Sequence, residues 1–138
     1  MARVAGKIAI VSGASLGIGR ATALLLAKEG SSVIVGDINE EDGQKVVSEI
    51  EAAGGKAAFV RLDVRKEEDW KAATETTLKT FGRLDITVNN AGIAYNGTVE
   101  STSLDDWRRV QSINLDGVFL GTKYAIEAIR KHGEGGSI

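Results

Sequence analysis

The sequence contains no cysteine and no proline among its 138 residues, and only one histidine. Without cysteine the chain can form no disulfide and no thiolate metal site, and His132 alone leaves little for a zinc site or a serine–histidine pair. We therefore expect no metal centre. No apolar run is long enough to span a bilayer, and no signal peptide is recognisable, which favours a cytoplasmic protein with no membrane partner.

A large excess of charge of one sign is also lacking. The formal net charge is -2, and acidic and basic residues are mixed along the chain, so we expect no general attraction to nucleic acid. The hydrophobic content of 43% and the charged content of 26% are those of an ordinary globular domain with a core. What the sequence does have is 17 glycines, and because they cluster, their positions are informative.

Short β-branched runs alternate with helical patterns along the whole chain. The patterns predict strands at residues 7–12, 33–37, 56–64 and 84–88, and helices at 18–28, 39–53, 67–81 and 104–131. The pairs Asn39–Asp42 and Ser103–Asp106 have the spacing of helix caps. This alternation predicts βαβ units in one α/β domain spanning residues 1–138: a Rossmann-like, doubly wound parallel sheet of about four strands, with a fifth beginning at "GGSI".

Three further expectations concern packing. Trp70 and Trp107 are both expected to face the core, and His132 to be solvated near the end of the last helix. Without a full fifth strand, residues 84–88 would form an exposed sheet edge. The last helix would then lack neighbours for apolar residues that favour self-association: Val118, Phe119, Leu120 and Ile126.

The segment "SGASLGIG", residues 12–19, joins the first strand to the first helix. A glycine-rich turn at this point brings backbone N–H groups and a helix N-terminus to bear on an anion such as a pyrophosphate. Gly13 would permit the tight turn, Gly17 the close backbone approach, and Gly19 the packing of helix on strand. The spacing is not the generic G-x-G-x-x-G, so a turn needed only for packing remains an alternative.

Asp37 and Asp63 end the second and third predicted strands. A carboxylate at Asp37 can accept hydrogen bonds from ribose hydroxyls and would repel a 2′-phosphate, which favours NAD over NADP. Neither Leu16 nor Ile38 supplies a compensating cation. Asp63 would lie near an adenine, although it could instead simply begin the turn into the next helix.

Four ordered motifs resemble the short-chain dehydrogenase/reductase family: "SGASLGIG", "DV" at 63–64, "NNAG" at 89–92, and the asparagine of "SINLDGVF". The resemblance runs from about residue 5 to the last residue, with Ser12 where the family more often has threonine. Its segments "NNAGIA" and "INLDGVFLGTK" are similar to secondary-alcohol dehydrogenases and 3-oxoacyl-carrier-protein reductases.

The resemblance implies roles for individual residues. Asn114 would support a water-linked proton relay in the catalytic site, and Asn89 would stabilise the turn after the fourth strand. The residues implied in cofactor binding are Gly13, Ser15, Leu16, Gly17, Ile18, Gly19, Asp37, Asp63, Val64, Asn90 and Gly92. By its residue type alone, a mid-helix asparagine such as Asn114 needs a partner, and a satisfied core amide is the alternative.

The family's proton donor is a tyrosine followed four residues later by a lysine, with a serine upstream. Tyr95 is followed at that spacing by Val99, and Tyr124 by Ala128, so neither fits. The resemblance places the catalytic serine just past Ile138, and we expect these 138 residues alone to be inactive in hydride transfer.

The sequence therefore predicts the NAD-binding half of an oxidoreductase that acts on a small secondary alcohol or ketone and associates with copies of itself. A non-catalytic dinucleotide-binding module is the alternative. A Rossmann-like methyltransferase is a more remote one, since "NNAG" and Asn114 have no role there.

Overall fold

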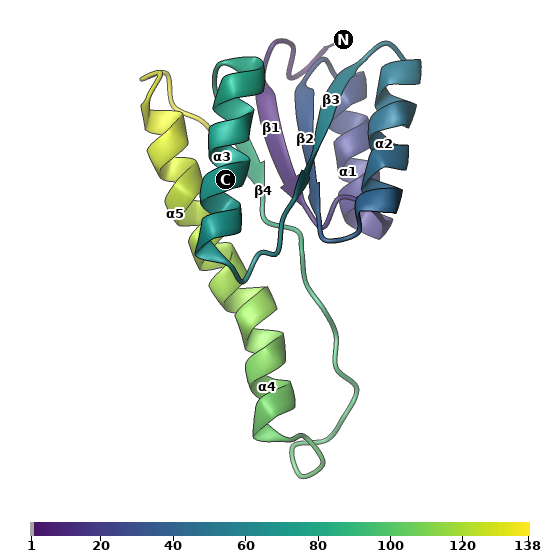
Figure 1. Cartoon of the computed structure of the whole chain (residues 1–138), viewed down its shortest axis with the longest axis vertical. Coiled ribbons are helices and arrows are strands. Elements are labelled where there is room, and N and C mark those ends of the chain that lie inside the picture. The colour runs from purple at the N-terminus through teal and green to yellow at the C-terminus, as the bar shows by residue number, and fades with distance from the viewer. Residues whose placement is uncertain (1) are drawn as a thin grey trace.

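Four parallel strands form the sheet at the centre of the fold (Figure 1). They are seen in a computed structural model that describes residues 2–138: β1 (Ile8–Ser12), β2 (Ser32–Asp37), β3 (Lys56–Arg61) and β4 (Ile86–Val88). The strand order is β3-β2-β1-β4, and every pair is parallel, which confirms the Rossmann-like sheet. All residues of β1 are buried because it is an inner strand with helices on both faces.

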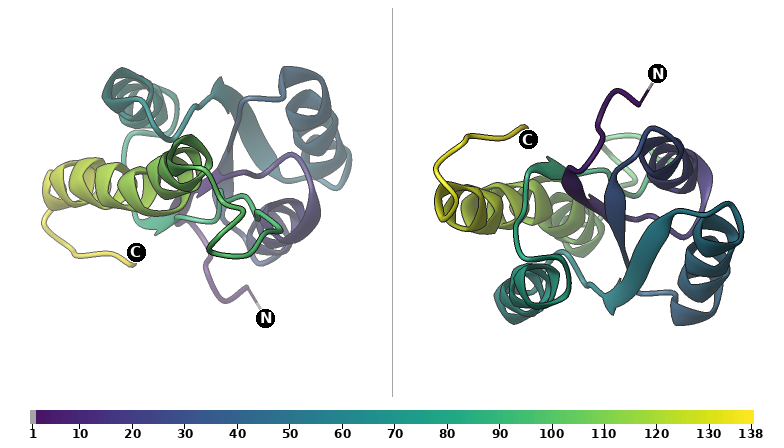
Figure 2. Two further views of the ribbon diagram at one scale, coloured as in Figure 1. Left: turned by 90° about the horizontal axis from the view of Figure 1, so that it is seen from below. Right: turned by 90° about the horizontal axis from the view of Figure 1, so that it is seen from above.

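Helices cover both faces of the sheet. α1 (Gly17–Lys28) and α2 (Glu40–Ala52) lie on one side, and α3 (Glu67–Phe81) and α5 (Gly117–Arg130) on the other (Figure 2). Each side has its own apolar core. Val33, Val46 and Ile50 belong to the α1–α2 side, whereas Trp70 and Ile129 belong to the α3–α5 side. The doubly wound arrangement predicted from the sequence is thus confirmed.

The predicted helix caps are formed. The Asn39 side chain accepts the N–H of Asp42 at 3.1 Å, and the Ser103 hydroxyl accepts that of Asp106 at 3.0 Å. Gly82 ends α3 with a φ of 86°, a left-handed conformation that glycine adopts at little cost. These local signals explain why the predicted starts of α2 and α4 (Leu104–Gln111), and the predicted end of α3, agree with the structure to within about a residue.

The long helix predicted over residues 104–131 is present but is not uniform. It consists of α4 (Leu104–Gln111), a π-helical turn η1 (Ser112–Asp116) and α5. α4 extends beyond the carboxyl ends of the strands, beside the loop that leaves β4 (Figure 1). A π turn holds one more residue than an α turn and is rare outside functional sites, so hydrophobic periodicity alone did not reveal it.

Two packing expectations were wrong. Trp107 is 57% exposed on α4, because α4 projects past the sheet and has no core to face there. The ring of His132 is not solvated: its Nε2 contacts the Leu84 carbonyl at 2.9 Å, and the side chain is only 14% exposed. Trp70, by contrast, is 1% exposed, as expected.

The edge of the sheet beside β4 is not bare. Ser137 pairs with Ile86 in a parallel bridge, donating its N–H to the Asp85 carbonyl and accepting the Thr87 N–H. "GGSI" therefore begins to add beside β4, as predicted, and covers part of the edge that was expected to be open. β3 and β4 are both shorter than predicted, because ladder pairing of β3 stops at Arg61 and that of β4 begins at Ile86.

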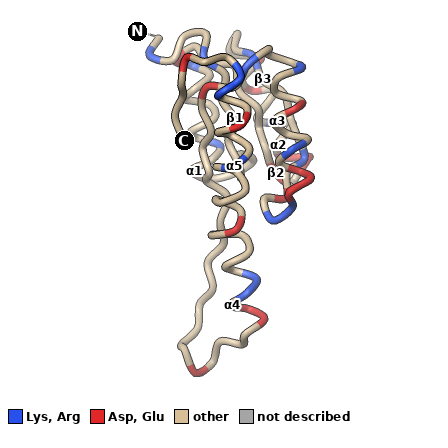
Figure 3. Tube along the Cα trace, turned by 90° about the vertical axis from the view of Figure 1, so that its left-hand side faces the viewer, with Lys and Arg blue, Asp and Glu red and all other residues tan. Residues whose placement is uncertain are grey.

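Charged residues of both signs are mixed along the trace (Figure 3). In the loop from Asn89 to Ser103, Glu100 is the only charged residue. Within residues 2–138, no helix is both long and apolar enough to cross a membrane.

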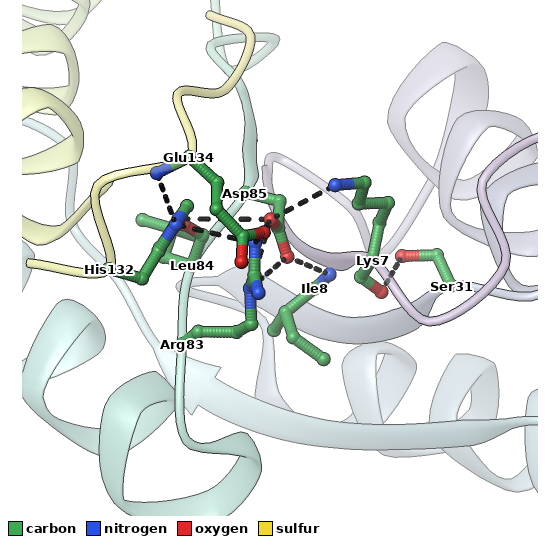
Figure 4. Close-up of polar contacts among 8 residues, drawn as sticks. All are labelled: Lys7, Ile8, Ser31, Arg83, Leu84, Asp85, His132 and Glu134. Atoms are coloured by element: carbon green, nitrogen blue, oxygen red, sulfur yellow. Dashed lines mark hydrogen bonds and ion pairs between the residues drawn. The ribbon is translucent and has the colours of Figure 1, made fainter. Parts of the chain in front are cut away.

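A buried carboxylate joins the amino-terminal ends of β1 and β4 (Figure 4). Asp85 is 1% exposed; it accepts the Ile8 N–H at 2.9 Å and a hydrogen bond from Arg83 at 2.6 Å. Burial raises the pKa of this carboxyl, but the hydrogen bonds outweigh burial and the net shift is downward. Arg83 also binds Glu134 at 2.7 Å, which ties the C-terminal segment to the same cluster.

Removing this carboxylate should destabilise the fold. We expect Asp85→Ala to lower the free energy of unfolding by about 3 kcal/mol, because it leaves the buried Ile8 N–H without its acceptor and removes the buried carboxylate that pairs with Arg83. Urea denaturation measures this. Because the pKa of folded Asp85 is lowered, the contribution is present above about pH 4 and is lost as the pH falls further.

The matched control is Glu134→Gln, which alters an exposed partner of the same arginine and should cost far less stability than Asp85→Ala. Equal losses in the two variants would contradict a central role for Asp85.

Candidate cofactor-binding site

A cavity of about 690 Å³ lies at the carboxyl-terminal edge of the sheet, the side from which α4 projects. Five segments far apart in the sequence line it: the turn after β1, the segments at the ends of β2, β3 and β4, and the long helix with Arg109 and Ile113. Of the eleven residues expected to bind a cofactor, ten line this one cavity: Gly13, Ser15, Leu16, Gly17, Ile18, Asp37, Asp63, Val64, Asn90 and Gly92. The volume is typical of a small-molecule site.

The glycine turn suits an anionic group. Gly13 and Gly17 have φ angles of 64° and 56°, which side chains on L-residues rarely adopt, and a Cβ at Gly17 would meet no atom within 4 Å. The N-terminus of α1 follows immediately, and no side chain caps it. Its first-turn N–H groups therefore have no side-chain acceptor, and Gly17 and Ile18 of this turn line the cavity, which fits a pyrophosphate.

Gly19 is the predicted residue that does not line the cavity. A Cβ there would lie 2.1 Å from the Gly13 carbonyl oxygen and 2.5 Å from the Asn90 amide nitrogen. Its absence of a side chain lets α1 pack directly against the turn, the structural task expected of it.

Ser12 and Asn90 bind each other across the ends of β1 and β4. The Ser12 hydroxyl accepts the N–H groups of Asn90 and Ala91 at 3.0 and 3.1 Å, and the Asn90 amide donates to the carbonyls of Ser12 and Gly13. The Asn90 N–H is therefore occupied, and its carbonyl is the backbone group that remains for a ligand. These bonds hold the glycine turn against "NNAG".

The Asp37 carboxylate is fixed by the backbone around it. One oxygen accepts the Ser15 N–H and the other the Asn39 N–H, both at 3.0 Å. The turn after β1 is thereby tied to the end of β2. Each oxygen keeps a further lone pair, so the carboxylate can still accept hydroxyl hydrogens from the cavity.

Asp63 is held by a neighbour that sequence reasoning did not single out. Arg65 donates from Nε and Nη2 at 2.9 and 2.6 Å, and its backbone N–H donates at 3.1 Å. These hydrogen bonds lower the pKa of Asp63 to about 2, against a smaller opposing effect of burial. The carboxylate is thus ionised throughout the physiological range.

Asn114 lies in the π turn outside the cavity wall, but it touches a residue of that wall. Its amide accepts the Ile93 N–H and donates to the Ile93 carbonyl, both at 2.8 Å. This gives the asparagine the partner its position demanded, and the partner is a loop backbone rather than the core. The contact fixes the loop after β4 relative to the helix.

The first asparagine of "NNAG" faces the helix layer. The Asn89 side-chain amide donates to the Thr122 hydroxyl at 3.3 Å. The oxygen of the same amide, Oδ1, is buried and has no hydrogen-bond partner among residues 2–138. A Cβ on Gly121 would lie 2.1 Å from that oxygen, so the turn needs glycine on α5 to pack.

Some residues of the cavity wall were not predicted. Arg65 had a signal that could have found it, namely a cation two positions after a strand-end acid. Five others adjoin predicted residues in the sequence: Ile38, Asn39, Leu62, Ala91 and Ile93. Only Arg109 and Ile113 depend on tertiary packing that the sequence pattern did not reveal. Within the described part of the chain, no three His, Asp or Glu side chains are grouped to hold a metal ion.

Comparison with known proteins agrees with this geometry. The family model for short chain dehydrogenases matches residues 7–138. The chain is 50% identical to a cyclohexanol dehydrogenase of Acinetobacter sp. (strain SE19) over 132 residues, covering 94% of this chain and 52% of that protein. It is 45% identical to a cyclopentanol dehydrogenase of Comamonas sp. (strain NCIMB 9872) over 135 residues, covering 98% and 54%.

A solved short-chain type dehydrogenase/reductase from Mycobacterium marinum superposes with a TM-score of 0.94 at 35% identity, covering 98% of this chain and 55% of that one. The chain belongs to the short-chain dehydrogenase family. It spans about half the length of the curated relatives it matches.

The Asn114–Ile93 contact can be tested by hydrogen exchange. We expect Asn114→Ala to speed exchange of the Ile93 amide about tenfold, because that N–H loses its acceptor, whereas Asn114→Asp keeps an acceptor oxygen and should retain part of the protection. Gln111→Ala, one turn earlier on the helix, is the control. Unchanged exchange at Ile93 in Asn114→Ala would show that the loop is held by other contacts.

Proposed function

We propose that this chain supplies the NAD-binding half of an oxidoreductase that interconverts small secondary alcohols and ketones. The observation that carries the proposal is the convergence of ten expected cofactor residues, from four segments, on one cavity. When bound, a nicotinamide dinucleotide supplies the site that accepts or donates hydride. The chain's own residues bind and orient it.

Distinct parts of the cavity suit distinct parts of the cofactor. The uncapped N-terminus of α1 and the turn with Gly13 and Gly17 would hold the pyrophosphate. Asp37 would accept the adenosine ribose hydroxyls, and Asp63 with Val64 would flank the adenine. Asn90, which lines the cavity, would contact the cofactor through its backbone carbonyl, and Asn114 fixes the loop through Ile93.

Preference for NAD over NADP follows from Asp37. Its carboxylate is held in place by two backbone N–H groups, so it cannot easily turn away from a 2′-phosphate. Asn39, which also lines the cavity here, is neutral. Coulomb repulsion between the carboxylate and the added phosphate disfavours NADP.

Replacing this carboxylate should change the cofactor preference. We expect Asp37→Asn, which keeps the side-chain shape, to lower the Kd for NADPH about tenfold and to raise the Kd for NADH by a similar factor. Fluorescence titration of both reduced cofactors measures this. Glu40→Gln, an exposed change of the same charge outside the cavity, should leave both constants unchanged. A variant with unaltered preference would assign discrimination to another residue.

Proton transfer is the part these 138 residues do not account for. The tyrosine–lysine pair implied by the resemblance is not met by Tyr95 or Tyr124. We therefore propose that the chain by itself binds the cofactor without turnover, and that turnover needs the serine, tyrosine and lysine in further chain. The alternative is a non-catalytic dinucleotide-binding module.

Binding and turnover separate these alternatives. The purified protein is titrated with NADH, then assayed with NAD and cyclohexanol or cyclopentanol, the alcohols named in two relatives, by the absorbance of the reduced nicotinamide. A 3-oxoacyl thioester with NADH tests the second substrate class. Binding with turnover by a longer chain supports the oxidoreductase. Binding without turnover by any longer chain supports the module, and absence of NADH binding contradicts both.

The exposed face of the long helix supports self-association. Leu115, Phe119 and Ile126 are 61%, 64% and 38% exposed along α5 and the turn before it, and Val118 is 37% exposed. Leu120, also expected to lack neighbours, instead packs against the core. A homo-oligomer would cover this face. Sedimentation equilibrium tests it, and a strictly monomeric protein would contradict it.

A further inference from the structure

The Arg65 guanidinium, which pairs with Asp63, has a place in the cavity wall and an orientation that the ion pair alone does not explain. Arg65 lines the cavity, although it is an exposed residue in the turn between β3 and α3. Asp63, its partner, is 7% exposed. The Arg65 side chain, 47% exposed, therefore turns back towards a buried carboxylate while keeping contact with solvent.

The contact to Asp63 fixes one edge of the guanidinium. Nε and Nη2 donate to different oxygens of the carboxylate, a two-point contact that holds the planar group in one orientation. Nη1 makes no hydrogen bond with residues 2–138. The flat face and the Nη1 edge of the group are thus left for a ligand.

The same contact changes what Asp63 can offer. An ionised carboxylate has about four acceptor positions, and Arg65 fills three of them. At most one position remains for an exocyclic amino group. Recognition of a base at this end of the cavity cannot then rest on Asp63 alone.

We propose that Arg65 is the adenine-binding surface of this site, with its guanidinium, held flat by Asp63, stacking on the purine of the dinucleotide. This rests on the proposed function. A planar, weakly hydrated guanidinium stacks well on aromatic faces, whereas a lysine ammonium does not. Val64, which lines the same cavity, adds apolar contact beside it.

Charge argues against the other ligand that an arginine could bind here, the 2′-phosphate of NADP. The charge of Arg65 is balanced by Asp63 at 2.6 Å, and Asp37 adds a second carboxylate to this end of the cavity. Arg65, Asp63 and Asp37 together therefore carry a net negative charge. A neutral purine suits it better than a dianion.

The test replaces Arg65 and measures each end of the cofactor separately. The probes are AMP, which has the adenosine end, and reduced nicotinamide mononucleotide, which has the other end, each competing with NADH. We expect Arg65→Met to raise the inhibition constant of AMP about fivefold and to leave that of the mononucleotide unchanged. Arg65→Lys, which keeps the charge without the plane, should not restore AMP binding.

Lys66→Met is the matched control, since it removes a neighbouring exposed charge that does not line the cavity, and it should change neither constant. Equal weakening of both probes by Arg65→Met would overturn the proposal in favour of a structural role. If a direct titration showed that Arg65→Met weakens NADPH binding without weakening AMP binding, that result would overturn it in favour of phosphate binding. An unchanged constant for AMP would also overturn it, while a wild-type protein that binds no NADH would refute the proposed function itself.

Discussion

The site depends on the reciprocal contact between Ser12 and Asn90. Ser12 is the last residue of β1, and Asn90 lies just after β4. The two strands are neighbours in the sheet although they are far apart in the sequence. A hydroxyl that accepts two backbone N–H groups, and an amide that donates to two carbonyls, satisfy polar groups at an edge where the ladder has ended. Because the glycine turn is one partner of this contact, its shape is set before any ligand arrives.

The contact also explains why Gly19 belongs to the site without touching the cavity. The Asn90 amide reaches the Gly13 carbonyl through space that a Cβ on Gly19 would fill. A similar constraint operates at Gly121, where the side chain of Asn89 occupies the corresponding space on the other side of the "NNAG" turn. Two asparagines side by side in sequence thus fix the turn to the end of β1 on one face and to α5 on the other.

Much of this was predictable from sequence because its signals are local. A cap such as Asn39, a left-handed Gly82 and a buried apolar run each act within a few residues, and the motif order places the ten cavity residues at one sheet edge. What failed was non-local. Trp107 is apolar at helical spacing, yet whether a core lies opposite depends on how far α4 projects beyond the sheet. His132 was misjudged because its partner, the Leu84 carbonyl, is 48 residues away in sequence.

The two ends of the sheet illustrate how one fold separates stability from binding. At the amino-terminal ends, Asp85 is surrounded by donors and leaves no acceptor free for a ligand (Figure 4). At the carboxyl-terminal ends, Asp37 and Asp63 are also held by donors, but each retains acceptor capacity towards an open cavity. The difference lies in what covers each edge: the C-terminal segment is tied to the Asp85 cluster through Glu134, whereas α4 projects beyond the opposite edge and only Arg109 and Ile113 of the long helix line the cavity there. Carboxylates with similar local bonding are therefore structural at one edge and available for recognition at the other.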